Sequence, residues 1–341
     1  MRRGRTLRRS HLYVGALLGA CALLFAPSHD AARARQAAAG EGRVSILFTA
    51  LGKDGKFVQG LKAEDMSVTV DGVPRTVLEM RRQTNVPLFL AVALDNSASQ
   101  ERLLPSTRVA ADFFVRGAVV VGVDKAAVVA FGGETVLEQE VTGDVQKVRE
   151  AIARVQFVPP PGYRAGGIVV GLPNDLMRAA QTGVWDAVWV ISTDVLSRAL
   201  GPGRRAVLLV TDGVDTSSRE KLSDAVAAAL QSEAVVYAVG VGDEKHFEGV
   251  DKKSLRKLAA ETGGRAFFPK KVRELNDAFH RISEELTSQY VMTLGVPATP
   301  PDGSFHKVEI KLANSALRSQ GVELSYPQGY YAGNRPTAVR R

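Results

Sequence analysis

Residues 88–99 read LFLAVALDNSAS, and this stretch decides the fold class. Its seven consecutive apolar residues, 88–94, are typical of a strand buried on both faces. Similar apolar runs recur at residues 126–131, 206–210 and 234–239. Stretches with apolar residues at helical spacing lie between these runs. The alternation predicts an α/β domain over residues 86–287, with a doubly wound, mostly parallel sheet and helices on both faces.

The segments on either side have a different pattern. Residues 43–82 and 288–331 alternate apolar with polar positions, which indicates antiparallel strands with one solvated face. The two segments could form one small β-sandwich built from both ends of the chain, or they could be two separate β appendages. Residues 332–341 are expected to be a loose tail.

The N-terminal segment resembles an export signal. Five arginines within the first nine residues precede an apolar stretch, residues 12–26, and Ala32-Arg33-Ala34 offers the small residues that a signal peptidase reads. We therefore expect residues 1–34 to be a signal peptide and the protein to be periplasmic, secreted or attached to the envelope. Lipidation at Cys21 and an uncleaved N-terminal anchor are alternatives, and they are the two ways in which a membrane would be involved.

Composition excludes several classes of protein. The 341 residues are 45% hydrophobic and 23% charged, which is typical of a globular protein and not of a disordered or multi-span membrane protein. Six arginines and one aspartate in residues 1–34 account for +5 of the net charge of +8, which leaves +3 for the rest. That remainder is too small to favour a nucleic-acid partner. Cys21 is the sole cysteine, so neither an internal disulfide nor a cysteine-based zinc site is possible.

Oxygen-bearing side chains follow two of the apolar runs. Asp95, Ser97 and Ser99 come directly after the first run, and Asp212 comes after a later one within Thr211-Asp212-Gly213. Ligands bind at the carboxyl ends of the strands in doubly wound sheets, and Mg²⁺ prefers such oxygen donors. Two adjacent aspartates would also repel each other unless a cation lay between them. The alternatives are ordinary ones: Asp95 or Ser97 caps a following helix, and Asp212 bonds to local backbone amides.

This combination of motifs resembles the von Willebrand factor type A (VWA) family and its metal-ion-dependent adhesion site. The family places a threonine on an intervening loop, and the stretch Gln181-Thr182-Gly183-Val184-Trp185-Asp186-Ala187 is similar to that loop. The resemblance implies that Mg²⁺, or Mn²⁺ or Ca²⁺ in its place, is held by five residues: Asp95, Ser97, Ser99, Thr182 and Asp212. It also implies that an acidic side chain of a protein partner fills a remaining coordination position. The alternative for Thr182 is the N-cap of a helix.

The flanking segments resemble a bacterial exported VWA-related subgroup, on the basis of Asp54-Gly55, residues 61–66 and Gly329-Tyr330-Tyr331. We therefore expect an exported, metal-dependent protein-binding module, whose specificity comes from loops such as residues 159–164. The alternatives are a structural or envelope-assembly factor with a stabilising metal, and a metal-assisted hydrolase. We do not expect an enzyme, because the sequence has no phosphate-binding loop and no evident general base.

Overall fold

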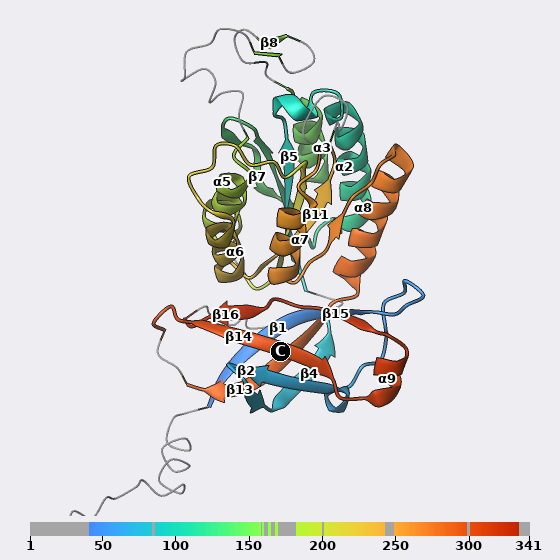
Figure 1. Cartoon of the computed structure of the whole chain (residues 1–341), viewed down its shortest axis with the longest axis vertical. Helices are drawn as coiled ribbons and strands as arrows, with labels where there is room; N and C mark the ends of the chain where they lie inside the picture. The colour runs from blue at the N-terminus through green and yellow to red at the C-terminus, as the bar shows by residue number, and fades with distance from the viewer. Residues whose placement is uncertain are drawn as a thin grey trace, which may run out of the picture. The chain divides into compact units, whose positions relative to one another are not determined.

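The computed structural model describes residues 41–83, 86–157, 159, 163–164, 168–169, 182–199, 201–242, 249–298 and 301–333 (Figure 1). The predicted signal peptide and most of the predicted tail lie outside these residues, as do residues 160–162 of the loop 159–164. Among the described residues, no helix combines the length and the apolar character that a membrane crossing requires.

A six-stranded sheet forms the centre of the α/β part. In spatial order its strands are β12 (Ala266–Phe267), β11 (Ala234–Gly240), β10 (Arg204–Thr211), β5 (Leu88–Asp95), β6 (Lys125–Phe131) and β7 (Thr135–Thr142). The first five are mutually parallel, as predicted, and every residue of β5 is buried. The apolar run of residues 88–94 is therefore a central strand covered on both faces.

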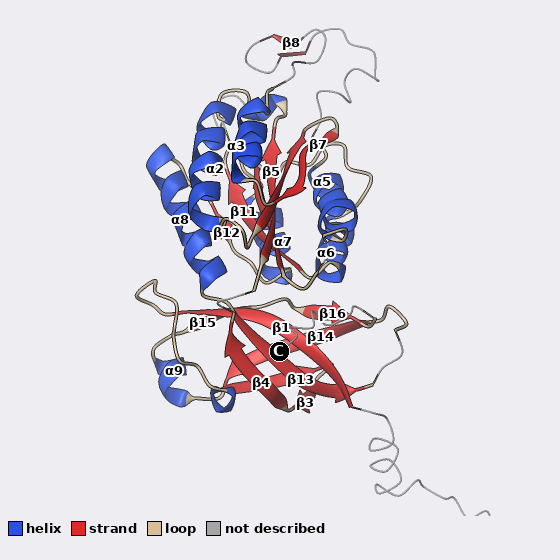
Figure 2. Cartoon of the chain, turned by 180° about the vertical axis from the view of Figure 1, so that it is seen from behind, coloured by secondary structure: helices blue, strands red, loops and turns tan. Residues whose placement is uncertain are grey.

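Helices cover both faces of this sheet (Figure 2). One face packs on α2 (Leu104–Ala118), α3 (Val145–Arg154) and α8 (Val272–Thr287). The other packs on α5 (Val184–Val190), the π-helix η3 (Ile191–Leu196), α6 (Leu222–Gln231) and α7 (Lys252–Glu261). Successive residues of β5 alternate between the two cores, since Leu90 and Val92 belong to the first and Ala91 and Ala93 to the second. This period of two is the reason that the strand must be apolar throughout.

The edge strand β7 departs from the parallel arrangement. It pairs antiparallel with β6, and its burial pattern has no fully buried position. A mixed edge of this kind is common in doubly wound sheets. Because β7 is partly solvated on both faces, it has no continuous apolar run, and the sequence pattern therefore does not predict this strand.

Segments from both ends of the chain form two antiparallel sheets. The first has the order β15 (Glu323–Ser325), β1 (Glu41–Leu51), β13 (Tyr290–Pro297), β4 (Val77–Arg82). The second has the order β16 (Gly329–Tyr331), β14 (Phe305–Leu312), β2 (Met66–Val70), β3 (Val73–Arg75). Their inward side chains form one hydrophobic core, which includes Phe48 stacked on Tyr290 with ring centroids 5.3 Å apart. We call these two sheets the β region.

Short elements complete the described chain. They are the 3-10 helices η1 (Ala63–Asp65) and η2 (Ala98–Gln100), the helix α9 (Ser315–Ser319) and the hairpin of β8 (Tyr163–Arg164) with β9 (Ile168–Val169).

Candidate metal centre

The first candidate ligand stands where β5 ends. β5 and β10 are parallel neighbours, with Leu94 opposite Val210, so the residues that follow both strands meet at one edge of the sheet. Asp95 is 3% exposed, and its Oδ1 accepts a hydrogen bond of 2.9 Å from the Ser97 backbone N–H. Its Oδ2 accepts one of 2.5 Å from the Thr211 hydroxyl. The carboxylate is therefore fixed by its own loop and by the end of the adjacent strand.

The two serines of the motif face the same point. Ser97 Oγ lies 3.1 Å from Ser99 Oγ, and the Ser99 hydroxyl hydrogen-bonds to Asp212. Ser97 precedes the short helix η2, but its side chain makes no capping hydrogen bond there. The capping alternative for Ser97 is thus wrong, and its hydroxyl is directed toward the other candidate ligands.

Asp212 lies in the second loop. It is 2% exposed; its Oδ1 accepts from the Val214 backbone N–H at 3.0 Å, and its Oδ2 accepts from Gln100 Nε2 at 3.1 Å. The following Gly213 has a φ of +75°, which a glycine adopts without strain. The local backbone bond is the one expected for a loop aspartate, but the Gln100 and Ser99 contacts tie Asp212 to the loop of Asp95.

The electrostatics of the pair favour a bound cation. Burial and the neighbouring Asp212 charge raise the pKa of the Asp95 carboxyl to about 7. Burial also raises the pKa of Asp212, against the effect of hydrogen bonds from Ser99, Val214 and Gln100. Within the described chain, neither carboxylate forms an ion pair with a lysine or arginine. Two buried like charges without a cation are costly, and a divalent ion between them would remove that cost.

The donor set fits a hard cation. The described residues contain no group of three or more His, Cys, Asp or Glu side chains that could hold a metal ion. The donors at this edge are instead two carboxylates and several hydroxyls, all of them oxygen. Mg²⁺, Mn²⁺ and Ca²⁺ bind through such oxygen ligands, and Mg²⁺ completes its shell with water.

Thr182 is held against the loop of Asp212. Its backbone N–H donates to Thr216 Oγ1 at 2.8 Å, and its carbonyl accepts from the Thr216 and Ser217 N–H groups at 2.9 and 3.2 Å. The next residue, Gly183, donates to the Gly132 carbonyl at 3.0 Å, and a Cβ on Gly132 would lie 3.4 Å from Ser97 Cα. The segment thus lies between the loops of the other candidates. Gly183, and not Thr182, is the N-cap of α5, so the capping alternative for Thr182 is also wrong.

Comparison with known families agrees with this geometry. Residues 177–281 match the model of the von Willebrand factor type A domain. This part of the chain is therefore similar to a VWA domain. No curated protein matches the chain.

Solved structures with a similar arrangement include a von Willebrand factor type A protein from Catenulispora acidiphila, at 12% identity and a TM-score of 0.48, with 85% of this chain and 73% of that chain covered. Proximal thread matrix protein 1 from the mussel byssus, with a zinc-occupied MIDAS motif, has 16% identity and a TM-score of 0.47 over 62% of this chain and 48% of its own. BatB from Bacteroides thetaiotaomicron has 15% identity and a TM-score of 0.43 over 60% and 100%. The match spans about half the length of the mussel protein.

Three residues that position the loops of the α/β part were not predicted from the sequence. Gln100 is 1% exposed and bridges Asp212 to the Val241 carbonyl, with both distances 3.1 Å. Asp215 accepts from the Val184 N–H at 2.8 Å and therefore caps α5 from another loop. Asp186 accepts from the backbone of residues 219 and 220. Of these three residues, only Asp186 could have been noticed in the sequence, because it lies in the stretch 181–187 that carries the family resemblance.

Three further polar side chains have contacts that do not involve the candidate ligands. Asn96 donates to the Gln156 carbonyl at 3.1 Å, in keeping with a position that does not contribute a ligand. His306 Nδ1 lies 2.8 Å from Asp71 Oδ2 in the β region, and His280 pairs with Glu284 on α8 at 3.6 Å. These contacts account for both histidines structurally.

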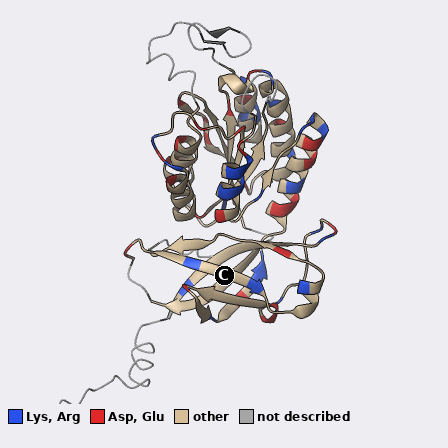
Figure 3. Cartoon of the chain, in the orientation of Figure 1, with Lys and Arg blue, Asp and Glu red and all other residues tan. Residues whose placement is uncertain are grey.

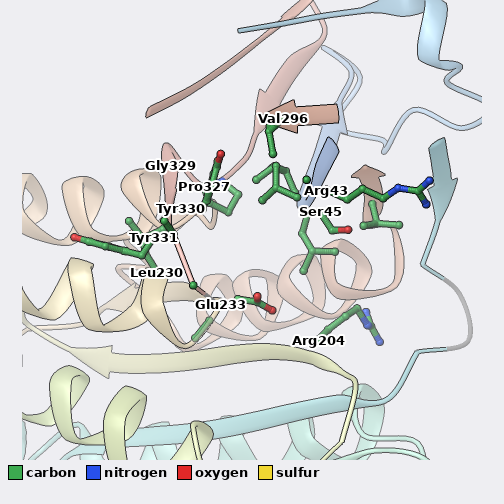
Figure 4. Close-up of a pocket in the computed structure, with 18 of the residues that line it drawn as sticks. Arg43, Ser45, Arg204, Leu230, Glu233, Val296, Pro327, Gly329, Tyr330 and Tyr331 are labelled. Atoms are coloured by element: carbon green, nitrogen blue, oxygen red, sulfur yellow. The ribbon is translucent and has the colours of Figure 1, made fainter. Parts of the chain in front are cut away.

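A separate, mostly apolar cavity of about 400 Å³ lies where β10 begins, at the opposite edge of the parallel sheet (Figure 4). Arg204, Glu233, Tyr330 and Tyr331 are among its lining residues. The Arg204 guanidinium donates hydrogen bonds to the carbonyls of Val86 and Leu286 and to Gln289 Oε1. None of the five candidate ligands lines this cavity, so it is distinct from the candidate metal centre.

Proposed function

We propose that this chain is an exported protein whose VWA domain binds a divalent cation and, through it, a carboxylate of a protein partner. Asp95, Ser97, Ser99, Thr182 and Asp212 hold the ion, which is Mg²⁺ or, in its place, Mn²⁺ or Ca²⁺. The observation that carries the proposal is the pair of buried, mutually repelling carboxylates, which hydrogen bonds from both loops hold together with the serine hydroxyls. The match of residues 177–281 to the VWA family supports the assignment of Thr182 and Asp212, which lie within it.

The protein residues have separate parts in this function. When bound, the ion supplies a positive centre that accepts an additional carboxylate oxygen. Thr211 and the Ser97 N–H orient Asp95, while Gln100 and the Val214 N–H orient Asp212. Because these partners fix the carboxylates before the ion binds, little ordering is needed on binding.

Calorimetric titration with Mg²⁺ tests the ion. Wild type is expected to bind one Mg²⁺, and Asp95→Ala is expected not to bind. Asp194→Asn is the matched control, because this carboxylate is half-exposed on η3 and, among the described residues, forms its ion pair with Arg198. Equal binding by wild type and Asp95→Ala would contradict the assignment.

An immobilised peptide with a single aspartate tests the carboxylate. Capture of the protein is expected in Mg²⁺ and not in EDTA, and the asparagine version of the peptide is expected to be inactive. Mg²⁺ binding without any carboxylate capture would instead indicate a metal that only stabilises the fold, as in an envelope-assembly factor.

N-terminal sequencing of the chain recovered from the producing cells tests export. Cleavage of the signal peptide predicts a mature chain that begins at Arg35. A lipidated Cys21 or an intact Met1 would each replace the cleaved form with an anchored one.

A further inference from the structure

A groove of about 550 Å³ lies beside the candidate metal centre. Its walls come from the segment between η2 and α2, the end of β11, the start of α7 and the loop that precedes α8. We call it the basic groove, and the residues that matter here are Arg102, Ser106, Lys252, Phe268, Lys270 and Lys271.

The basic groove begins one hydrogen bond away from Asp212. Gln100 Nε2 donates both to Asp212 Oδ2 and to the carbonyl of Val241, which lines the groove. On another wall, the Asp251 N–H donates to the Asp212 carbonyl at 2.8 Å, and Lys252 is the next residue. These bonds place the groove next to the loop that carries Asp212, within reach of a partner segment whose carboxylate is at the candidate metal centre.

Among the described residues that line the basic groove, the charge is one-sided. Four cationic side chains are among the described residues that line it, and no carboxylate is. Lys252, Lys270 and Lys271 form no ion pair with any described residue, and Lys270 and Lys271 are exposed. Figure 3 shows that α7, at one wall, carries positive charge along much of its length.

Two nearby carboxylates among the described residues are engaged with the backbone. Glu274 accepts from the Lys270 N–H at 2.8 Å, and Asp251 caps α7 through the Ser254 N–H at 3.1 Å. These acids stabilise the loop and the helix and are not themselves lining residues. The positive potential of the groove is thus left for a negatively charged occupant.

We propose that the basic groove binds the acidic continuation of the partner segment whose first carboxylate reaches the metal. The partner is therefore a protein with an extended run of aspartate and glutamate, rather than one with an isolated acid. This inference rests on the proposed function. The attraction adds both affinity and orientation, since the cationic side chains that line the groove come from several of its walls.

Fluorescence anisotropy with two labelled synthetic peptides tests the proposal. One peptide carries five consecutive acidic residues, and the other carries one aspartate with serines at the remaining positions. The variant Lys270→Glu/Lys271→Glu is compared with Lys53→Glu/Lys56→Glu, which makes the same change in net charge on an exposed turn of the β region. In Mg²⁺, the groove variant is expected to bind the acidic peptide at least about fivefold more weakly than wild type, and the control variant within about twofold. The single-aspartate peptide is expected to lose less than about twofold in either variant.

Three results are decisive. If both charge-reversal variants bound the acidic peptide equally weakly, the proposal of a binding groove would be overturned, because the loss would then reflect net charge alone. A thymidine oligonucleotide of equal charge that binds as tightly as the acidic peptide, with or without Mg²⁺, would also overturn it in favour of a general polyanion surface. Acidic-peptide binding that is insensitive to EDTA but weakened by Lys270→Glu/Lys271→Glu would refute the metal function and support the groove.

Discussion

Gly213→Ala tests how the packing of α7 fixes the candidate metal centre. Gly213 has a φ of +75°, and a Cβ added there would lie 2.7 Å from Cγ of Leu255, which is 0% exposed. The left-handed backbone costs an alanine about 1–2 kcal/mol, and overpacking against a buried side chain costs about 1–3 kcal/mol. We therefore expect Gly213→Ala to lower the free energy of unfolding by about 2–5 kcal/mol.

Gly122→Ala is the matched control. Its φ of +80° is similar, but a Cβ there would meet nothing within 4 Å. It should therefore cost only the backbone part, about 1–2 kcal/mol. Urea unfolding in EDTA measures both variants. A loss in Gly213→Ala no greater than that in Gly122→Ala would refute the packing argument.

A double-mutant cycle isolates the contact itself. Leu255→Ala alone should cost about 2–5 kcal/mol, because it leaves a cavity in a buried core. The same truncation makes room for the new Cβ, so Gly213→Ala/Leu255→Ala should cost about 1–3 kcal/mol less than the sum of the single variants. Because Asp212 immediately precedes Gly213, Mg²⁺ affinity should fall in Gly213→Ala and recover in part in the double variant. Additive free energies would show that the two positions are not in contact.

Three further predictions concern charges and hydroxyls. Asp95→Asn removes the repulsion between two buried carboxylates, so its melting temperature in EDTA should be no lower than that of wild type. Mg²⁺ should raise the melting temperature of wild type but not that of Asp95→Asn, and thermal unfolding in EDTA and in Mg²⁺ measures both effects. Thr182→Ser keeps the hydroxyl and should retain Mg²⁺ affinity within about threefold, whereas Thr182→Val should lose at least about tenfold by calorimetric titration. Arg265→Met removes the cation 3.1 Å from the buried Glu285 carboxylate and should cost about 3–5 kcal/mol at pH 8. Burial raises the pKa of Glu285, so the contribution of this carboxyl to stability is present at low pH and is lost as the pH rises through the raised pKa. Urea unfolding should therefore find a smaller cost of Arg265→Met at pH 5 than at pH 8. A cost that does not change with pH would contradict this prediction.

The sequence by itself determined the fold class of the α/β part. An apolar run such as residues 88–94 reports burial on both faces, because a strand alternates its side chains and only a fully covered one is apolar at every position. The positions of Asp95 and Asp212 followed from the same argument, since the carboxyl ends of parallel neighbours share one edge. The loop around Thr182 was located through the family resemblance and not through any local pattern.

Tertiary structure alone decided how these loops are held and what lies beside them. Gln100 bonds to Asp212 and to Val241, which lie 112 and 141 positions further along the chain. Strand β1 pairs with β13, although most of the chain separates them. The basic groove brings together Lys252 at the start of α7, Lys270 and Lys271 before α8, and Arg102. Local periodicity encodes which face of an element is buried, but it does not encode which distant side chain that face meets. That choice depends on the packing of whole elements, which is settled only when the chain has folded.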